Sequence, residues 1–102
     1  MSTTAPEWLD DIRQRLTTEY EDQSRRLATL LAEPSDAAEA HTRDAMIATI
    51  RESLEQLSAA LLRIDEGRYG KCEECGDPIP RERLEIRPQA SFCVPCQRRH
   101  DG

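Results

Sequence analysis

Four cysteines arranged in two pairs constrain this chain more than any other feature of its sequence. Cys72 and Cys75 form one C-x2-C pair, Cys93 and Cys96 form the second, and seventeen residues separate the pairs. Two such pairs at this separation are typical of a four-thiolate zinc site. Each pair makes a tight knuckle, and the two knuckles complete a tetrahedron with Zn–S bonds of about 2.3 Å. Because four sulfur ligands close the coordination sphere, we expect one structural Zn²⁺ rather than a catalytic metal.

Two other uses of the thiols remain open at this stage, namely two disulfides or a redox role. Disulfides are typical of exported proteins, and residues 1–7 carry neither the basic nor the apolar run of a secretory signal. The sequence also has no stretch near the ~20 apolar residues of a membrane span. We therefore expect a cytoplasmic protein with reduced thiols and no membrane contact. His41 and His100 are not needed as ligands, and we expect both at the surface.

Apolar side chains recur at helical spacing in two long segments. The first runs from residue 7 to 33 without Gly or Pro, and its stripe has Ile12 and Leu31 beside it. The stripe itself consists of Leu9, Leu16, Tyr20, Gln23, Leu27 and Leu30. Pro34 ends this segment, and Ser35 or Asp36 can cap a second helix that stops before Gly67 and Gly70. The second stripe has coiled-coil spacing and consists of Ile47, Ile50, Leu54, Leu57, Leu61 and Ile64.

A break of two or three residues forces two long helices to run antiparallel, so that each buries the narrow stripe of the other. The predicted fold class is mainly α, an antiparallel helical hairpin (coiled coil) with a C-terminal four-cysteine zinc finger. The hairpin occupies residues 1–66, with its tip at 33–38, and the finger occupies residues 67–102 with a short C-terminal helix. Only 37% of the residues are hydrophobic, which is too few for a large globular core.

Within the finger, two local features follow from the sequence. Gly76 comes directly after the first knuckle, where we expect the backbone to approach a sulfur closely. A minimal core around the metal is expected from Ile79, Leu84, Ile86 and Phe92.

The charge is unevenly placed along the chain. Residues 1–66 carry a net charge of −7, whereas residues 67–102 carry +1. An acidic arm argues against wrapping nucleic acid, whose phosphates require a basic surface. It indicates a partner with a positive groove or a bound cation, unless the charges are simply those of a solvated helix surface.

The hairpin tip places two carboxylates, Glu33 and Asp36, around the helix break. One interpretation is helix capping, since Asp36 near a helix N-terminus interacts favourably with the dipole. The other is functional: a projecting acidic tip reaches a metal ion or a basic patch in the cleft of a partner, and carboxylates are suitable neighbours for Mg²⁺.

No set of nucleophile, base and orienting group appears in the sequence, and there is no Gly-rich phosphate loop, so we expect no enzyme. Basic residues cluster around the finger. They are either ordinary surface charge or contacts to a protein rim or an anionic nucleotide. The residues concerned are Arg81, Arg83, Arg87, Arg98 and Arg99.

A hairpin with an acidic tip followed by this finger resembles the DksA/TraR family of bacterial transcription regulators. The resemblance is carried by residues 64–88, from Ile64 through the first knuckle and the Arg-Leu-Glu-Ile-Arg-Pro run, and by Phe92 to Cys96. It implies direct binding to RNA polymerase rather than reading of promoter DNA. It further implies that the finger docks at the rim of the secondary channel and that the hairpin inserts its tip near the catalytic Mg²⁺. The family's tip pattern falls on Glu33, Asp36 and Ala38, with Glu33 where the best-known members have Asp.

The resemblance also bears on guanosine tetraphosphate, an alarmone that some members share with the polymerase. The basic residues that hold it in those members correspond here to Gln56, Arg87 and Gln97, so that only Arg87 keeps its charge. A phosphate site with one of three cations binds more weakly. Arg98 and Arg99 are possible substitutes, but we expect a weak or absent alarmone response.

Two other functions remain open. The chain would be a zinc-ribbon nucleic-acid-binding protein if Arg81 to Arg99 contacted DNA, although the total charge of −6 argues against this. It would be a coiled-coil adaptor if its helical stripe packed against another chain. For the polymerase regulator we expect a monomer.

Overall fold

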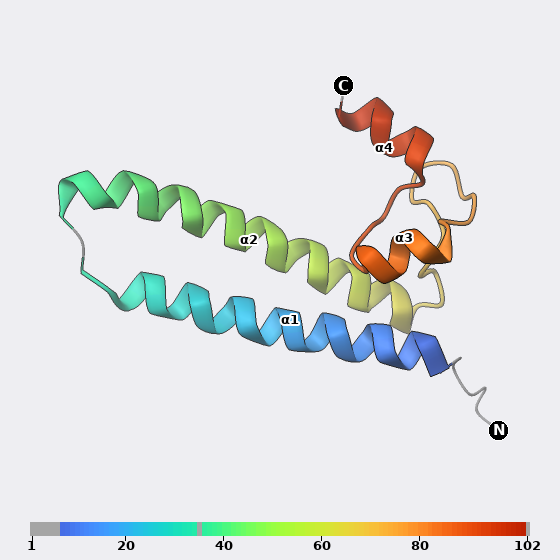
Figure 1. Cartoon of the computed structure of the whole chain (residues 1–102), viewed down its shortest axis with the longest axis horizontal. Coiled ribbons are helices and arrows are strands. Elements are labelled where there is room, and N and C mark those ends of the chain that lie inside the picture. The colour runs from blue at the N-terminus through green and yellow to red at the C-terminus, as the bar shows by residue number, and fades with distance from the viewer. Residues whose placement is uncertain (1–6, 35, 102) are drawn as a thin grey trace.

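The computed structural model describes residues 7–34 and 36–101, and it contains four helices over that part of the chain. The long helices α1 (Glu7–Ala32) and α2 (Ala37–Asp65) run antiparallel and side by side (Figure 1). The short helices α3 (Arg81–Ile86) and α4 (Val94–Asp101) belong to the finger, which lies at the open end of the hairpin. The tip lies at the far end of a molecule that measures 53 × 37 × 20 Å. The predicted fold class is confirmed.

Local sequence accounts for the break between the two long helices. The last hydrogen bond of α1 runs from Glu33 N–H to Thr29 O, after which Pro34 cannot continue the helix. Asp36 is the N-cap of α2, with extended backbone angles and a carboxylate that accepts the Glu39 N–H at 2.9 Å. The break spans residues 33–36, slightly longer than predicted, and Ser35, the other predicted cap, lies outside the described residues.

The hairpin interface is packed most densely at the finger end. Its fully buried cluster consists of Ile12, Leu16, Leu57, Ala60 and Ile64. Ala60 has no exposed surface, and such a small side chain allows a close approach of α1. Nearer the tip, Ile50 is buried while Leu27, Leu30 and Ile47 are only half-buried. The axes of α1 and α2 also lie farther apart toward the tip (Figure 1).

Two predictions for the stripe of α1 need correction. We expected Ile12 beside the stripe, but it is a core residue. Leu9 and Leu16 lie two helical turns apart, and a heptad pattern requires one further apolar side chain between them, which Ile12 supplies. Tyr20 was placed in the stripe but is exposed, in the part of the hairpin where the interface is looser.

The finger packs on the hairpin through aromatic residues that contact both cores. Trp8 of α1 and Tyr69 of the linker each pack against the hairpin cluster and the finger cluster. The Arg81 guanidinium lies over the Trp8 ring, 4.8 Å from its centroid. Tyr69 Oη donates to Pro88 O at 2.8 Å, and burial raises the pKa of Tyr69 to about 12, so its hydroxyl remains a donor.

The finger core differs from the prediction at one position. Ile79, Leu84 and Ala90 are buried with three of the cysteines, and Phe92 packs against them. Ile86, which we expected in this core, is 84% exposed. It follows Leu84 by two positions on α3, and two residues turn a helix by about 200°. A six-residue helix that buries Leu84 therefore directs Ile86 to the opposite side.

Among residues 7–34 and 36–101, no helix combines the length and the apolar character required to cross a membrane.

Truncating Leu16 should destabilise the hairpin strongly. Leu16→Ala removes a side chain that is 1% exposed, and the cavity and lost burial should lower the free energy of unfolding by about 2–5 kcal/mol. Leu31→Ala on the same helix is the matched control, because Leu31 is 54% exposed and its loss should cost about 0.5 kcal/mol or less. Urea denaturation of the zinc-loaded protein, followed by helical circular dichroism, measures both. Equal losses would contradict the described packing.

Candidate metal centre, hairpin tip and finger cavity

The four cysteine sulfurs gather at one point between the two knuckles. All four Sγ atoms lie within 4.8 Å of one another, and Cys75 Sγ is 3.7 Å from Cys93 Sγ. Tetrahedral coordination with Zn–S bonds of about 2.3 Å requires sulfurs about 3.8 Å apart. Cys72, Cys93 and Cys96 are buried and only Cys75 is exposed. The donor set and its spacing fit Zn²⁺.

Backbone hydrogen bonds shape the first knuckle and link it to the segment before the second. Cys72 N–H donates to Asp77 O and Glu73 N–H donates to Ser91 O, each at 2.8 Å. Gly76 has a φ of +80°, a conformation that glycine adopts without strain. Apart from its chain neighbours, a Cβ built on Gly76 would meet no atom within 4 Å, so crowding is not the reason for the glycine. The turn itself requires the glycine.

The protein environment acts differently on the two innermost sulfurs. Burial works to raise the pKa of Cys72, but backbone N–H groups of Cys75, Cys93 and Glu74 outweigh it and lower that pKa to about 6. Burial raises the pKa of Cys96. Cys96 lies in the first turn of α4, where the helix dipole favours a thiolate, and metal binding requires deprotonated sulfur.

All four cysteines are free thiols, so the disulfide alternative does not describe this structure. The chain has one structural Zn²⁺ site, formed by Cys72, Cys75, Cys93 and Cys96. Neither histidine is needed as a ligand. His41 is exposed on α2, and His100 contacts Glu74 and stacks on Phe92.

The tip residues are exposed, and one of them has a structural role. One oxygen of Asp36 is engaged as the α2 N-cap, which confirms the capping interpretation without testing the functional one. Glu33 and Ala38 are also exposed. Arg43 of α2 reaches across the break and donates to Glu33 O at 2.6 Å. The backbone conformation of the tip is therefore held from the α2 side.

Arg87 lines a cavity of about 290 Å³ between α2 and the finger. The two glutamines singled out together with it, Gln56 and Gln97, line the same cavity. Arg98 and Arg99 do not. Arg98 is exposed on α4, and Arg99 contacts Glu74 and Cys96.

Sequence reasoning missed a second arginine of this cavity. Arg63 is 5% exposed, and its Nη2 lies 3.5 Å from the carbonyl oxygens of Gln89 and Ala90. Burial lowers the pKa of Arg63, and the nearby Glu73 opposes that shift. Arg63 falls outside the heptad stripe of α2, so the periodicity gave no signal that the finger covers it.

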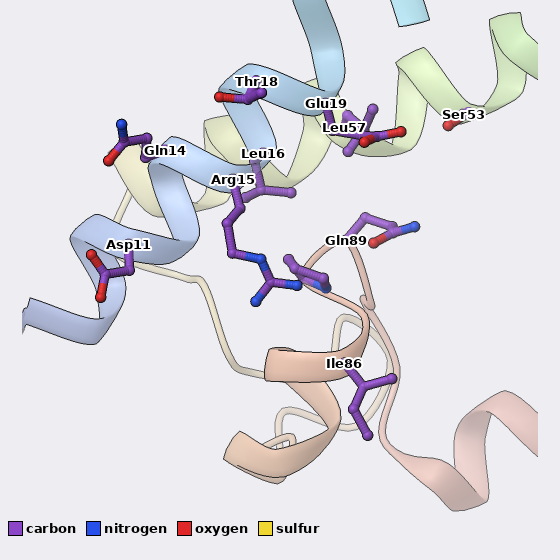
Figure 2. A pocket seen from close by; sticks show the side chains of 11 residues that line it. Asp11, Gln14, Arg15, Leu16, Thr18, Glu19, Ser53, Leu57, Ile86 and Gln89 are labelled. Carbon is purple, nitrogen blue, oxygen red and sulfur yellow. The ribbon is translucent and has the colours of Figure 1, made fainter. Parts of the chain in front are cut away.

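A second hollow, of about 720 Å³, lies between the hairpin and the finger and shares Gln89 with the first. Figure 2 shows Arg15 extending from α1 toward the finger segment that carries Gln89. Ile86 lines the finger side of this hollow, and Leu16 and Leu57 line its hairpin side.

Comparison with known proteins shows the family to which the chain belongs. Residues 67–102 match the model of the prokaryotic dksA/traR C4-type zinc finger. The solved structure of the transcription factor DksA2 from Pseudomonas aeruginosa is 30% identical to this chain, with 93% of this chain and 78% of that one covered and a TM-score of 0.55. The chain belongs to the DksA/TraR family.

Other known proteins are similar to this chain in sequence or in fold. The Caulobacter vibrioides DksA, an RNA polymerase-binding transcription factor, is 38% identical over 88 residues. Those residues are 86% of this chain but 57% of that relative, so the chain spans little more than half the length of this curated member. The DnaK suppressor protein of Agrobacterium tumefaciens shares the fold, with a TM-score of 0.70 at 24% identity over 95% of this chain and 97% of that one.

Two substitutions distinguish the capping role of Asp36 from the effect of its charge. Asp36→Ala should lower the free energy of unfolding by about 1 kcal/mol, because the Glu39 N–H loses its acceptor. Asp36→Asn keeps an oxygen acceptor, and asparagine caps about as well, so its loss should be much smaller. Thermal or urea unfolding of the zinc-loaded variants measures both. Equal destabilisation by the two substitutions would contradict the cap.

Proposed function

We propose that this protein is a bacterial transcription regulator that binds RNA polymerase directly in the cytoplasm. Membership of the DksA/TraR family supports this, as does the Caulobacter relative that is described as an RNA polymerase-binding transcription factor. The finger would dock at the rim of the secondary channel, and the hairpin would enter the channel tip first. Initiation would then change at sensitive promoters, because the tip acts on the active-site region.

The observation that carries this proposal is the placement of two features at opposite ends of one molecule. The zinc-stabilised finger lies at the open end, and the exposed carboxylates of Glu33 and Asp36 lie at the far end (Figure 1). α2 alone spans about 43 Å at 1.5 Å per residue. A protein shaped in this way can hold a surface with one end and place negative charge deep in a channel with the other.

Electrostatics favour the same orientation. The hairpin segment 1–66 carries a net charge of −7, and a channel that leads to bound Mg²⁺ attracts negative charge. The same charge disfavours direct contact with DNA phosphates. Glu33 is one methylene longer than the aspartate of the best-known members and less restricted in rotamer, so it would approach the metal with a different reach.

Guanosine tetraphosphate would bind weakly or not at all. Gln56, Arg87 and Gln97 line one cavity, but only Arg87 among these three carries a charge. Arg63 also lines it, although its guanidinium is directed at two backbone carbonyls of the finger. Arg98 and Arg99, the possible substitutes, are not among the residues that line this cavity.

In vitro transcription from a ribosomal promoter tests the role of the tip. Asp36→Asn should leave binding to core polymerase unchanged and abolish most of the regulatory effect, because it removes charge but keeps the cap. Asp44→Asn is the matched control, since Asp44 is an exposed carboxylate on α2 about two turns from the cap. Regulation by Asp36→Asn equal to that of the wild type would refute the tip mechanism.

Further measurements on the same variants test the partner and the alarmone. Co-purification with core polymerase, and competition with another channel-binding factor, should be observed for both variants. Salt-sensitive DNA binding without polymerase would instead favour a nucleic-acid-binding protein, and a dimer without polymerase contact would favour an adaptor. A strong alarmone effect that is lost in Arg87→Ala would contradict weak alarmone binding.

A further inference from the structure

Three polar side chains join α4 to the first knuckle beside the metal centre. Glu74 lies in the first knuckle, between Cys72 and Cys75. Its Oε2 accepts a hydrogen bond from Arg99 Nη2 at 3.0 Å, and its Oε1 lies 2.7 Å from His100 Nε2. Both carboxylate oxygens are thus engaged by α4, which places Glu74 at the centre of the contact between the two knuckles.

Arg99 also contacts a metal ligand. The same Nη2 atom lies 2.9 Å from Cys96 Sγ, on the ligand that is only 1% exposed. An Arg Nη atom carries two hydrogens, so a single Nη2 can donate to the carboxylate and to the sulfur at once. Arg99 is three residues beyond Cys96 on α4, and this spacing places both side chains on one face of the helix.

The orientation of α4 is supported from a second direction. The His100 ring stacks on Phe92, with 4.4 Å between ring centroids and 18° between planes. Phe92 in turn packs on the finger core. The helix that carries Arg99 is therefore held against the knuckle from two sides. The position of the guanidinium beside the sulfur depends on the stacking of His100 on Phe92 as well as on the exposed ion pair between Arg99 and Glu74.

The negative charge of the metal centre is the reason that a hydrogen bond from Arg99 stabilises it. Four thiolates around Zn²⁺ leave a net charge of −2, and three of the four sulfurs belong to buried residues. Buried charge is costly unless it is paired and hydrogen-bonded. Hydrogen bonds from outer residues orient ligands and tune a metal site, and their loss typically costs 10- to 100-fold in metal affinity.

We propose that Arg99 is a positioning residue of the metal centre, which donates through Nη2 to the Cys96 thiolate and is itself held in place by Glu74. This role differs from the rim or nucleotide contact expected for Arg99 from the sequence. It depends on the zinc site alone and stands whether or not the chain binds polymerase.

Zinc competition in the whole chain of 102 residues provides the first test. Arg99→Gln should weaken Zn²⁺ binding about 10-fold against a chromogenic chelator, because it removes the charge and its shorter amide side chain cannot place a donor where Nη2 lies. Arg98→Gln is the matched control, with the same charge change one residue earlier on the exposed side of α4, and should remain within about 2-fold of the wild type. Glu74→Gln should weaken binding by an intermediate amount, since the amide oxygen still accepts from Arg99.

Cobalt substitution separates donation to the sulfur from simple bracing of α4. With Co²⁺ in place of Zn²⁺, losing an N–H···S hydrogen bond raises the electron density on the sulfur. The sulfur-to-cobalt charge-transfer band should therefore move to lower energy in Arg99→Gln and stay in place in Arg98→Gln.

A zinc affinity of Arg99→Gln equal to that of Arg98→Gln would overturn the proposal. Weaker affinity with an unmoved band would also overturn it, because Arg99 would then act only by bracing. If Arg99→Gln fails to hold metal, the band is measured in Glu74→Gln instead, where it should move in the same direction by a smaller amount, and an unmoved band there would overturn the proposal.

Discussion

Coordination of one Zn²⁺ by four thiolates makes the finger possible as a folded unit. Apart from the cysteines, the fully buried apolar residues of the finger cluster are Ile79, Leu84 and Ala90. So small a core cannot offset the entropy of ordering the chain, whereas a structural zinc site contributes folding free energy directly. The turns of the finger, including Gly76, bring the sulfurs together, and the metal in turn holds those turns in place.

The finger stabilises more than itself, because its contacts fix its orientation on the hairpin. Trp8 and Tyr69 pack against both cores, and Arg63 is buried where the finger covers α2. The densest part of the hairpin interface lies at this junction. The tip is held locally, by the Asp36 cap and the Arg43 contact to Glu33 O. In the proposed function, docking the finger therefore aims a tip that lies one helix length away.

Much of this architecture could be predicted from the sequence, because its signals are local or periodic. The cysteine spacing predicted the four zinc ligands, and the heptad pattern predicted α2. Pro34 and Asp36 predicted the break between the two long helices and the N-cap of α2. The errors concern contacts between distant segments. The burial of Arg63 depends on where the finger docks, and the contact of Arg99 with Glu74 depends on how α4 meets the first knuckle. Ile86 was misplaced because hydrophobicity alone does not say which face of a six-residue helix is covered.

The central claim is that the hairpin delivers residues 33–38 to the active site of the polymerase while the finger remains at the rim. It is tested most directly by replacing the catalytic Mg²⁺ of core polymerase with Fe²⁺ and mapping where hydroxyl radicals cut the bound chain. The account predicts cuts clustered at residues 33–38 and an uncut finger. Cuts within residues 72–96, or a bound chain with no cuts at the tip, would contradict it.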